Sequence, residues 1–210
     1  MPITTLIADD HTLVREGLRS LLAAHANIDV VGFAANGREA VREALRLRPE
    51  VVLMDISMPE LNGIEATRQL VDRDAAAKVI ILSMHATIEH YHRAVRAGAR
   101  GYLLKESATE EIAEAVRTVH VGRQFISRKI TTSFQTQSGT ESPLDSLSRR
   151  EREILQLVAE GHCSAAIGAL ISISPKSVDT YRSRLMHKLG MRGMSDMVKF
   201  AIRHGLTTLD

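Results

Sequence analysis

Cysteine is nearly absent from this chain of 210 residues, in which Cys163 stands alone. One cysteine excludes an internal disulfide and any metal site built from several thiolates, and it fits a reducing compartment. Long apolar runs are missing as well, because none approaches the roughly 20 residues that a membrane-spanning helix needs. The chain reaches the acidic Asp9 too early to hold a secretory leader. We therefore expect a cytoplasmic protein that makes no use of a membrane.

The composition is otherwise that of an ordinary globular protein, with 44% hydrophobic and 25% charged residues. The formal net charge of +2 conceals an uneven distribution. Residues 1–122 contain 14 basic and 17 acidic residues, whereas residues 123–210 contain 13 basic and 8 acidic residues. A basic second half suggests a module that faces a polyanion such as DNA, although an ordinary solvated surface explains the excess equally well.

The first half alternates short apolar runs with amphipathic helical patterns. Parallel strands need helical crossovers, so this alternation predicts an α/β fold with a five-stranded, parallel, doubly wound sheet. The predicted strands are residues 3–8, 28–33, 50–54, 78–83 and 101–104.

The second half lacks comparable strand patterns and predicts a small all-α domain. Ser148 and Glu151 form a capping-box pattern, and Ser174 precedes Pro175 at the start of another helix. Between the halves lies a polar, Ser/Thr-rich stretch without periodicity. We predict a first domain over residues 1–122, a linker over 123–143 and a helical domain over 144–210.

Polar side chains follow the predicted strands at their carboxyl ends, where ligands bind in open parallel sheets. Asp9 and Asp10 follow the first strand, and Asp55 follows the third. Ser83 closes the fourth strand and Lys105 follows the fifth. Taken singly, each has a simpler explanation as a helix cap, a turn residue or a solvated lysine. Their common position at one sheet edge favours a functional site.

Three carboxylates at one edge repel one another, by roughly 4 kcal/mol for a pair at ~4 Å in a dielectric near 20. A bound cation relieves this repulsion, and an all-oxygen site suits Mg²⁺ with phosphate oxygens completing its shell. The Lys105 ammonium and the Ser83 hydroxyl are suitable partners for an incoming phosphoryl group. Asp55 is the natural nucleophile, since a carboxylate can form an aspartyl phosphate.

The motifs "ADDH", "VVLMDISMPELNGIEA", "ILSMH" and "GYLLKE" resemble the receiver domain of bacterial two-component response regulators, over residues 3 to about 120. The resemblance implies a flavodoxin-like strand order and phosphorylation of Asp55 by a cognate sensor histidine kinase. It also implies Mg²⁺ ligation by Asp10 and Asp55 directly, by Asp9 through water, and by the backbone carbonyl of Ser57. Ser83 and Lys105 would contact the phosphoryl group, and Tyr102 would be the switch aromatic. His11 and His85 border this site and are interpreted as polar loop residues, with a role for His85 in dephosphorylation as the alternative.

Residues 164–170, a short turn and residues 175–189 have the layout of a helix-turn-helix, whose second helix enters the DNA major groove. Val178, Leu185 and Leu189 form a core-facing stripe on that second helix. A charged helix on a plain bundle is the competing interpretation. The candidate DNA contacts are Lys176, Ser177, Asp179, Thr180, Arg182, Ser183, Arg184 and Lys188.

Residues 145 to 206 resemble the LuxR-type helix-turn-helix of the NarL/FixJ group, with two departures. Ala165 and Ala166 stand where that family has polar or charged residues, which removes phosphate contacts from the first helix. Asp179 stands where a basic residue is common, which would favour a cytosine amino group as its partner. The apolar side of the last helix, which includes Met197 and Ala201, serves dimerisation or core packing.

These observations predict a transcriptional regulator, not an enzyme, whose phosphorylation at Asp55 promotes a homodimer on double-stranded promoter DNA. Two alternatives remain. A Mg²⁺-dependent aspartyl phosphatase would usually carry a second acid two positions after the nucleophile, where this chain has Ser57. A DNA-binding regulator that works without phosphate would use the acidic pocket only for folding or docking.

Overall fold

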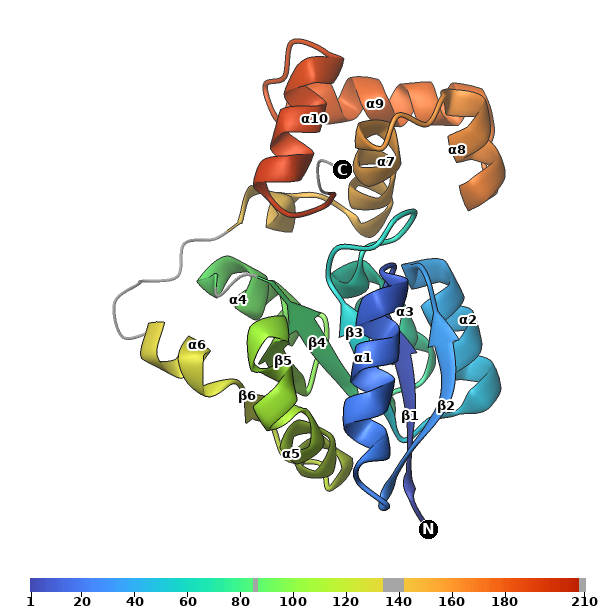
Figure 1. Ribbon diagram of the computed structural model, residues 1–210. Helices are drawn as coiled ribbons and strands as arrows, with labels where there is room; N and C mark the ends of the chain where they lie inside the picture. The colour runs from blue at the N-terminus through green and yellow to red at the C-terminus, as the bar shows by residue number, and fades with distance from the viewer. Residues whose placement is uncertain (85–86, 134–141, 208–210) are drawn as a thin grey trace. The chain divides into compact units, whose positions relative to one another are not determined.

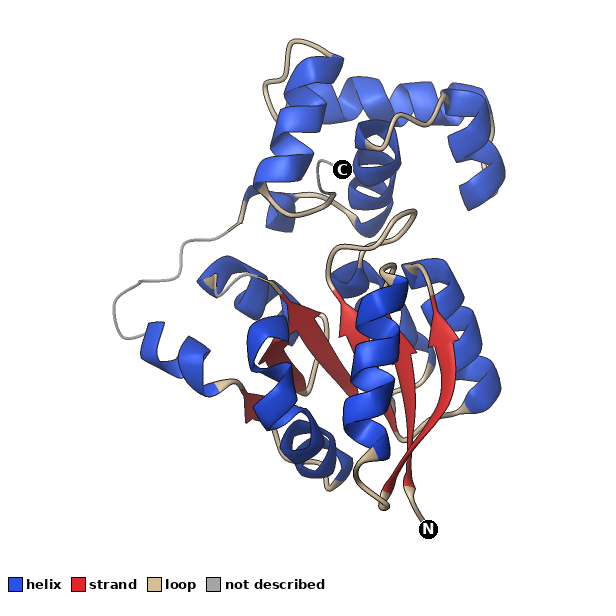
Figure 2. Cartoon of the chain, viewed as in Figure 1, coloured by secondary structure: helices blue, strands red, loops and turns tan. Residues whose placement is uncertain are grey.

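We describe the protein from a computed structural model that covers residues 1–84, 87–133 and 142–207. The chain forms two compact units. Figure 2 shows that strands occur in the first unit, whereas the second is helical. Within the described ranges, no helix is both long enough and apolar enough to cross a bilayer.

The first unit is a parallel sheet with helices on both faces (Figure 1). Its strands are β1 (Ile3–Ala8), β2 (Ile28–Ala34), β3 (Val51–Asp55), β4 (Val79–Ser83), β5 (Gly101–Leu104) and β6 (Phe125–Ile126), in the spatial order β2-β1-β3-β4-β5-β6. Its helices are α1 (Thr12–Ala23), α2 (Gly37–Leu47), α3 (Gly63–Arg73), α4 (Ile88–Arg96), α5 (Ala108–His120) and α6 (Arg128–Ser133), with a 3-10 turn, η1 (Lys105–Ser107), before α5. This confirms the predicted parallel, doubly wound fold.

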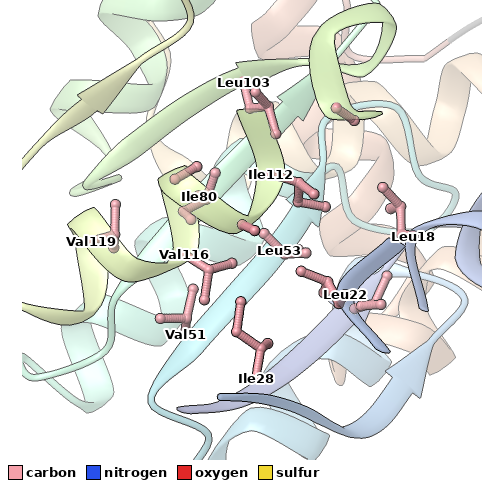
Figure 3. Close-up of a cluster of buried hydrophobic side chains, with 14 of the residues drawn as sticks. Leu18, Leu22, Ile28, Val51, Leu53, Ile80, Leu103, Ile112, Val116 and Val119 are labelled. Carbon is pink, nitrogen blue, oxygen red and sulfur yellow. The ribbon is translucent and has the colours of Figure 1, made fainter. Parts of the chain in front are cut away.

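The core of this unit lies on both faces of the sheet. Helices α1 and α5 pack side by side on one face, where Leu22 and Val116 meet Leu53 of the central strand (Figure 3). Helices α2, α3 and α4 cover the opposite face (Figure 1). Strand β3 is buried along its whole length, as expected for a strand enclosed between two helical layers.

The sheet has six strands within the described residues, so the prediction of five was wrong by one. Strand β6 pairs in parallel with β5, placing Ile126 beside Tyr102. Sequence alone gave no sign of β6, because two residues cannot establish a period. The strand is held instead by tertiary contacts: Ser127 donates its amide hydrogen to the Tyr102 carbonyl at 2.9 Å, and Ile130 is fully buried.

The predicted linker over residues 123–143 therefore begins with a strand and a helix that belong to the first unit. Helix α6 is fixed to it by the Ser127 hydroxyl, which donates to Glu111 at 2.5 Å, and by an ion pair between Lys129 and Glu106 at 3.1 Å. Residues 134–141 of that linker lie outside the described residues. The boundaries of the three segments stay a prediction.

The second unit contains a 3-10 turn, η3 (Pro143–Ser146), and the helices α7 (Arg149–Ala159), α8 (Ser164–Ile171), α9 (Pro175–Lys188) and α10 (Met194–Arg203). Ser148 caps α7 in the predicted capping box with Glu151, and the Ser174 side chain accepts from the Ser177 amide at the start of α9. The helices enclose one core. Its buried members include Leu144, Ile154, Leu157, Ile167, Val178, Leu185, Met197 and Leu206.

Candidate functional site

The register of the sheet brings the predicted polar residues of the first unit to one edge. Asp55 is the last residue of β3 and pairs with Leu82, so the next residue of β4, Ser83, lies just beyond it. Lys105 directly follows β5, and Asp9 directly follows β1. Asp9 is fully buried and Asp55 is 3% exposed. The edge therefore carries charged groups that water barely reaches.

Lys105 joins the two buried carboxylates. Its Nζ lies 2.7 Å from Oδ2 of Asp9 and 2.9 Å from Oδ1 of Asp55. Burial by itself would lower the pKa of the Lys105 ammonium, but the carboxylates of Asp55 and Asp9 outweigh it, and the net shift is upward. The ammonium is therefore charged at neutral pH and acts as the internal counter-ion of this edge.

The surroundings of Asp55 raise the pKa of its carboxyl group. Burial, together with the carboxylates of Asp9 and Asp10, raises its pKa to about 6, although the Lys105 ammonium opposes the shift. The charged form of Asp55 is thus costly in this environment. A further positive charge at the edge would stabilise the carboxylate in its nucleophilic form.

Asp10 lies at the outer side of the cluster and contacts His11. The Nδ1 atom of His11 is 2.7 Å from Oδ1 of Asp10, and the His11 amide donates to Oδ1 of Asp9 at 2.9 Å. Asp9, Asp10 and His11 each offer a ligand atom within 4.8 Å of one another. The other histidine that sequence placed near the site, His85, lies outside the described residues.

The donor set of this edge fits Mg²⁺. Among the described residues, the edge carries three carboxylates, those of Asp9, Asp10 and Asp55, and one ammonium, that of Lys105, which contacts Asp9 and Asp55. Two negative charges in excess at a largely buried site call for a divalent cation, and oxygen ligands are those that Mg²⁺ prefers. Ser57 lies two residues beyond Asp55, in the loop that leaves the edge.

That loop turns back tightly because of Gly63. The Gly63 amide donates to the Ile56 carbonyl at 2.9 Å, and a Cβ atom at residue 63 would lie 1.9 Å from the carbonyl oxygen of Asp55. No other residue fits there without moving the backbone. Asn62 is fully buried and caps α3 by accepting from the Glu65 amide. These contacts hold the chain on both sides of Asp55.

Ser83 connects the edge to an aromatic pair inside the unit. Its hydroxyl is hydrogen-bonded to that of Tyr102, and burial raises the pKa of Tyr102 to about 12. The Tyr102 ring stacks edge-to-face on Tyr91 of α4, with ring centroids 5.8 Å apart. No sequence motif marks Tyr91, and only packing reveals its contact with the predicted switch residue.

In the second unit, α8, a turn and α9 form the predicted helix-turn-helix. Ser172 adopts the left-handed conformation at the end of α8, with φ of 58°, and the Ile173 amide donates to the Gly168 carbonyl at 3.0 Å. A Cβ atom at residue 168 would lie 2.6 Å from the Ile173 carbonyl oxygen. Glycine at this position therefore lets the turn approach α8 closely.

Helix α9 has the predicted two sides. Val178 and Leu185 are fully buried, and Leu189 packs partly buried on the same core. Lys188 is exposed and forms an ion pair with Glu151 at 3.2 Å. The remaining candidate DNA contacts are exposed or partly exposed on α9: Lys176, Ser177, Asp179, Thr180, Arg182, Ser183 and Arg184.

The two neighbouring helices differ in what they offer. Ala165 and Ala166 present only methyl groups on α8. On α10, Met197 and Ala201 are buried in the core of the unit, which supports the core-packing interpretation for these two residues. Met194, at the start of α10, is 43% exposed.

Comparisons with known proteins agree with both halves of this description. The family model for the response regulator receiver domain matches residues 5–117, and the model for the LuxR family of bacterial regulatory proteins matches residues 145–201. The chain is 38% identical over 208 residues to response regulator UvrY of Escherichia coli strain K12, covering 97% of this chain and 95% of UvrY. It is 38% identical over 209 residues to response regulator GacA of Pseudomonas aeruginosa, covering 97% of each.

A solved structure is also similar over nearly the whole chain. Response regulator ChrA of a heme-sensing two-component system has a TM-score of 0.55 and 30% sequence identity, and the match covers 98% of both chains.

Proposed function

Because the chain belongs to the response regulators of the NarL/FixJ type, with a receiver domain followed by a LuxR-type DNA-binding domain, we propose that phosphorylation of Asp55 controls its binding to DNA. Regulation of transcription follows from the family. The observation that carries the phosphorylation proposal is the Lys105 ammonium within 2.9 Å of a buried, acidic Asp55.

The proposed phosphodonor is the phosphohistidine of a cognate sensor histidine kinase. An Oδ atom of Asp55 attacks the phosphorus, a P–O bond forms, and the P–N bond to histidine breaks. Asp9, Asp10, Asp55 and the Ser57 carbonyl would hold Mg²⁺, which neutralises charge on the phosphoryl oxygens when it is bound. Lys105 already lies beside Asp55 and supplies a second positive charge to those oxygens.

The signal is proposed to leave the site through Ser83 and Tyr102. The Ser83 hydroxyl can bond to a phosphoryl oxygen or to Tyr102, and both groups are nearly inaccessible to water. If Ser83 turns to the phosphoryl group, it gives up its hydrogen bond to Tyr102, and the Tyr102 ring changes its position beside Tyr91. Phosphate thereby biases a two-state equilibrium on the side of the sheet formed by α4 and β5.

The output is proposed to be a homodimer on double-stranded promoter DNA. The receiver would span residues 1–122, the linker 123–143 and the DNA-binding domain 144–210. A dimer would place two copies of α9 in major grooves about one helical turn apart. The residues of α9 proposed to face DNA are Lys176, Ser177, Asp179, Thr180, Arg182, Ser183, Arg184 and Lys188.

Acyl-phosphate formation tests this proposal. We would incubate the protein with Mg²⁺ and a small phosphodonor, then with a phosphohistidine donor, and follow the intact mass. We expect a base-labile gain of one phosphate that needs Mg²⁺ and is absent from Asp55→Asn. Asp29→Asn, a change of an exposed acid on β2, is the matched control and keeps the gain.

The same experiment separates the alternatives. If neither donor yields an adduct but the protein binds DNA, the regulator works without phosphate. If the phosphodonor is hydrolysed with rapid turnover, the aspartyl phosphatase interpretation is correct. DNA affinity with and without phosphate is the second measurement, and equal affinities would contradict control by Asp55.

A further inference from the structure

The cations of α9 differ in how firmly the protein itself holds them. Within the described residues, Lys176 and Arg184 are exposed and form no ion pair. The side chain of Arg182 is only 28% exposed, and it lies against α8. Counterion release depends on the number of phosphates that protein cations neutralise, so a held cation and a free cation do not contribute equally.

Three polar groups from two helices meet around Arg182. The Ser164 hydroxyl, at the start of α8, donates to Oδ1 of Asp179 at 2.6 Å. Nη1 of Arg182 donates to the same Ser164 oxygen at 3.2 Å and lies 3.7 Å from the Asp179 carboxylate. Asp179 precedes Arg182 by three residues, so both project from the same side of α9.

From this cluster we infer that Asp179 is a positioning residue: together with Ser164 it holds the Arg182 guanidinium away from the phosphate backbone and so weakens sequence-independent DNA binding. This inference rests on the proposed function of α9. It changes the role expected for Asp179, which would act through Arg182 and not through a cytosine amino group.

The electrostatics favour this role. Paired with Asp179, Arg182 contributes no net charge to the DNA-facing side. If Arg182 turns away from α8 to contact a phosphate, it gives up its contacts with Ser164 and Asp179 and leaves the Asp179 carboxylate, 62% exposed, near a like-charged backbone. A site with fewer free cations loses non-specific affinity first, because non-specific binding is almost entirely electrostatic. The ratio of specific to non-specific affinity rises accordingly.

The test measures the salt dependence of binding by the full chain to a labelled mixed-sequence duplex. Asp179→Asn keeps an oxygen that can accept from Ser164 but removes the ion pair. We expect the slope of log K against log salt to become steeper by about 0.9, the value for one additional phosphate contact. Between about 50 and 200 mM salt, this corresponds to a loss of affinity about threefold greater than in the unchanged protein.

Three further variants test the release of Arg182, and two of them, Ser164→Ala and Asp196→Asn, separate it from a simple change of charge. Asp179→Asn combined with Arg182→Gln should return the slope to that of the unchanged protein, since the released cation is gone. Ser164→Ala alters no charge and removes one of the two contacts of Arg182 while the Asp179 carboxylate remains, so it should steepen the slope by less than Asp179→Asn does. Asp196→Asn, on α10, removes the same charge from a carboxylate that also pairs with an arginine, Arg192 at 3.9 Å, and should leave the slope unchanged.

Two results would overturn the inference: an unchanged slope in Asp179→Asn, or a steeper slope that persists when Arg182 is replaced as well. Failure of the unchanged protein and of every variant to bind any duplex would instead reject DNA binding by α9, and with it the proposed function.

Discussion

The Nζ atom of Lys105 lies 2.9 Å from Oδ1 of Asp55, at the carboxyl edge of the sheet. The same ammonium reaches Asp9 at 2.7 Å, so a protein cation stands among the carboxylates proposed to hold Mg²⁺. Metal and lysine therefore draw on the same negative charges. We therefore expect bound Mg²⁺ to stabilise the protein more when the Lys105 ammonium is absent.

Lys105→Met removes the ammonium but keeps a side chain of similar length. In EDTA we expect the variant to lose about 3–5 kcal/mol of stability, the usual consequence of leaving buried charges unpaired. Addition of Mg²⁺ should raise its melting temperature more than it raises that of the unchanged protein. Lys129→Met, which breaks an exposed ion pair with Glu106, is the control and should cost less than about 1 kcal/mol. Equal Mg²⁺ shifts in both proteins would show that lysine and metal do not share these carboxylates.

Ser127→Ala tests what holds β6 to the receiver. The Ser127 hydroxyl donates to the buried Glu111 carboxylate, and its loss leaves that carboxylate short of a donor. We expect a loss of about 1–3 kcal/mol and faster exchange of the Ser127 amide, which is bonded to the Tyr102 carbonyl. Hydrogen exchange followed by mass spectrometry measures both. Ser20→Ala, at an exposed position of α1, should change neither, and unchanged exchange in Ser127→Ala would contradict the anchoring role.

Gly168→Ala and Gly17→Ala should have opposite effects. A Cβ at residue 168 meets the Ile173 carbonyl at 2.6 Å, so we expect about 1–3 kcal/mol of destabilisation from displacement of the turn. Nothing lies within 4 Å of a Cβ at residue 17, inside α1, where alanine should stabilise by about 0.5–1 kcal/mol. Scanning calorimetry of the full chain reports both. A stabilising Gly168→Ala would mean that the turn is looser than this contact implies.

The capping box of α7 should make stability depend on pH. Partial burial would raise the pKa of Glu151, but the hydrogen bonds from Ser148 and the Lys188 ammonium outweigh it, and the pKa lies below the ordinary 4.5. The contribution of Glu151 is therefore present above the pKa of the unfolded chain and is lost as pH falls through the lower folded value. The stability difference between the unchanged protein and Glu151→Gln should shrink on acidification, as followed by urea unfolding.

Two serines provide the matched comparison for that cap. Ser148→Ala should cost about 1 kcal/mol at neutral pH, because its side chain accepts from the Glu151 amide. Ser195 is exposed in the first turn of α10, and Gly193 occupies the cap position of that helix. Ser195→Ala should leave stability unchanged. Equal losses in the two variants would contradict this assignment.

The positions of the polar residues along the chain were predictable because strand ends are local features. Apolar runs that end at Asp9, Asp55 and Ser83 define where parallel strands stop, and parallel strands in register bring those ends together. The two sides of α9 followed from helical periodicity in the same way, as did the caps at Ser148 and Ser174. In each case the signal lies within a few residues of the feature it determines.

Tertiary structure decided the contacts between residues far apart in the chain. Strand β6 forms because β5 offers backbone groups for pairing and because Glu111 accepts a hydrogen bond from Ser127. The two residues of β6 are too few to show a periodic pattern in the sequence. Other contacts likewise depend on which side chains packing brings close together. They are the ring contact between Tyr91 and Tyr102, the ion pair between Lys105 and Asp9, and the hydrogen bond from Ser164 to Asp179. Sequence by itself determined which chemical groups are present and where each element ends. The three-dimensional fold alone determined which of those groups neutralise one another, because charge and hydrogen-bond interactions depend on distance in space.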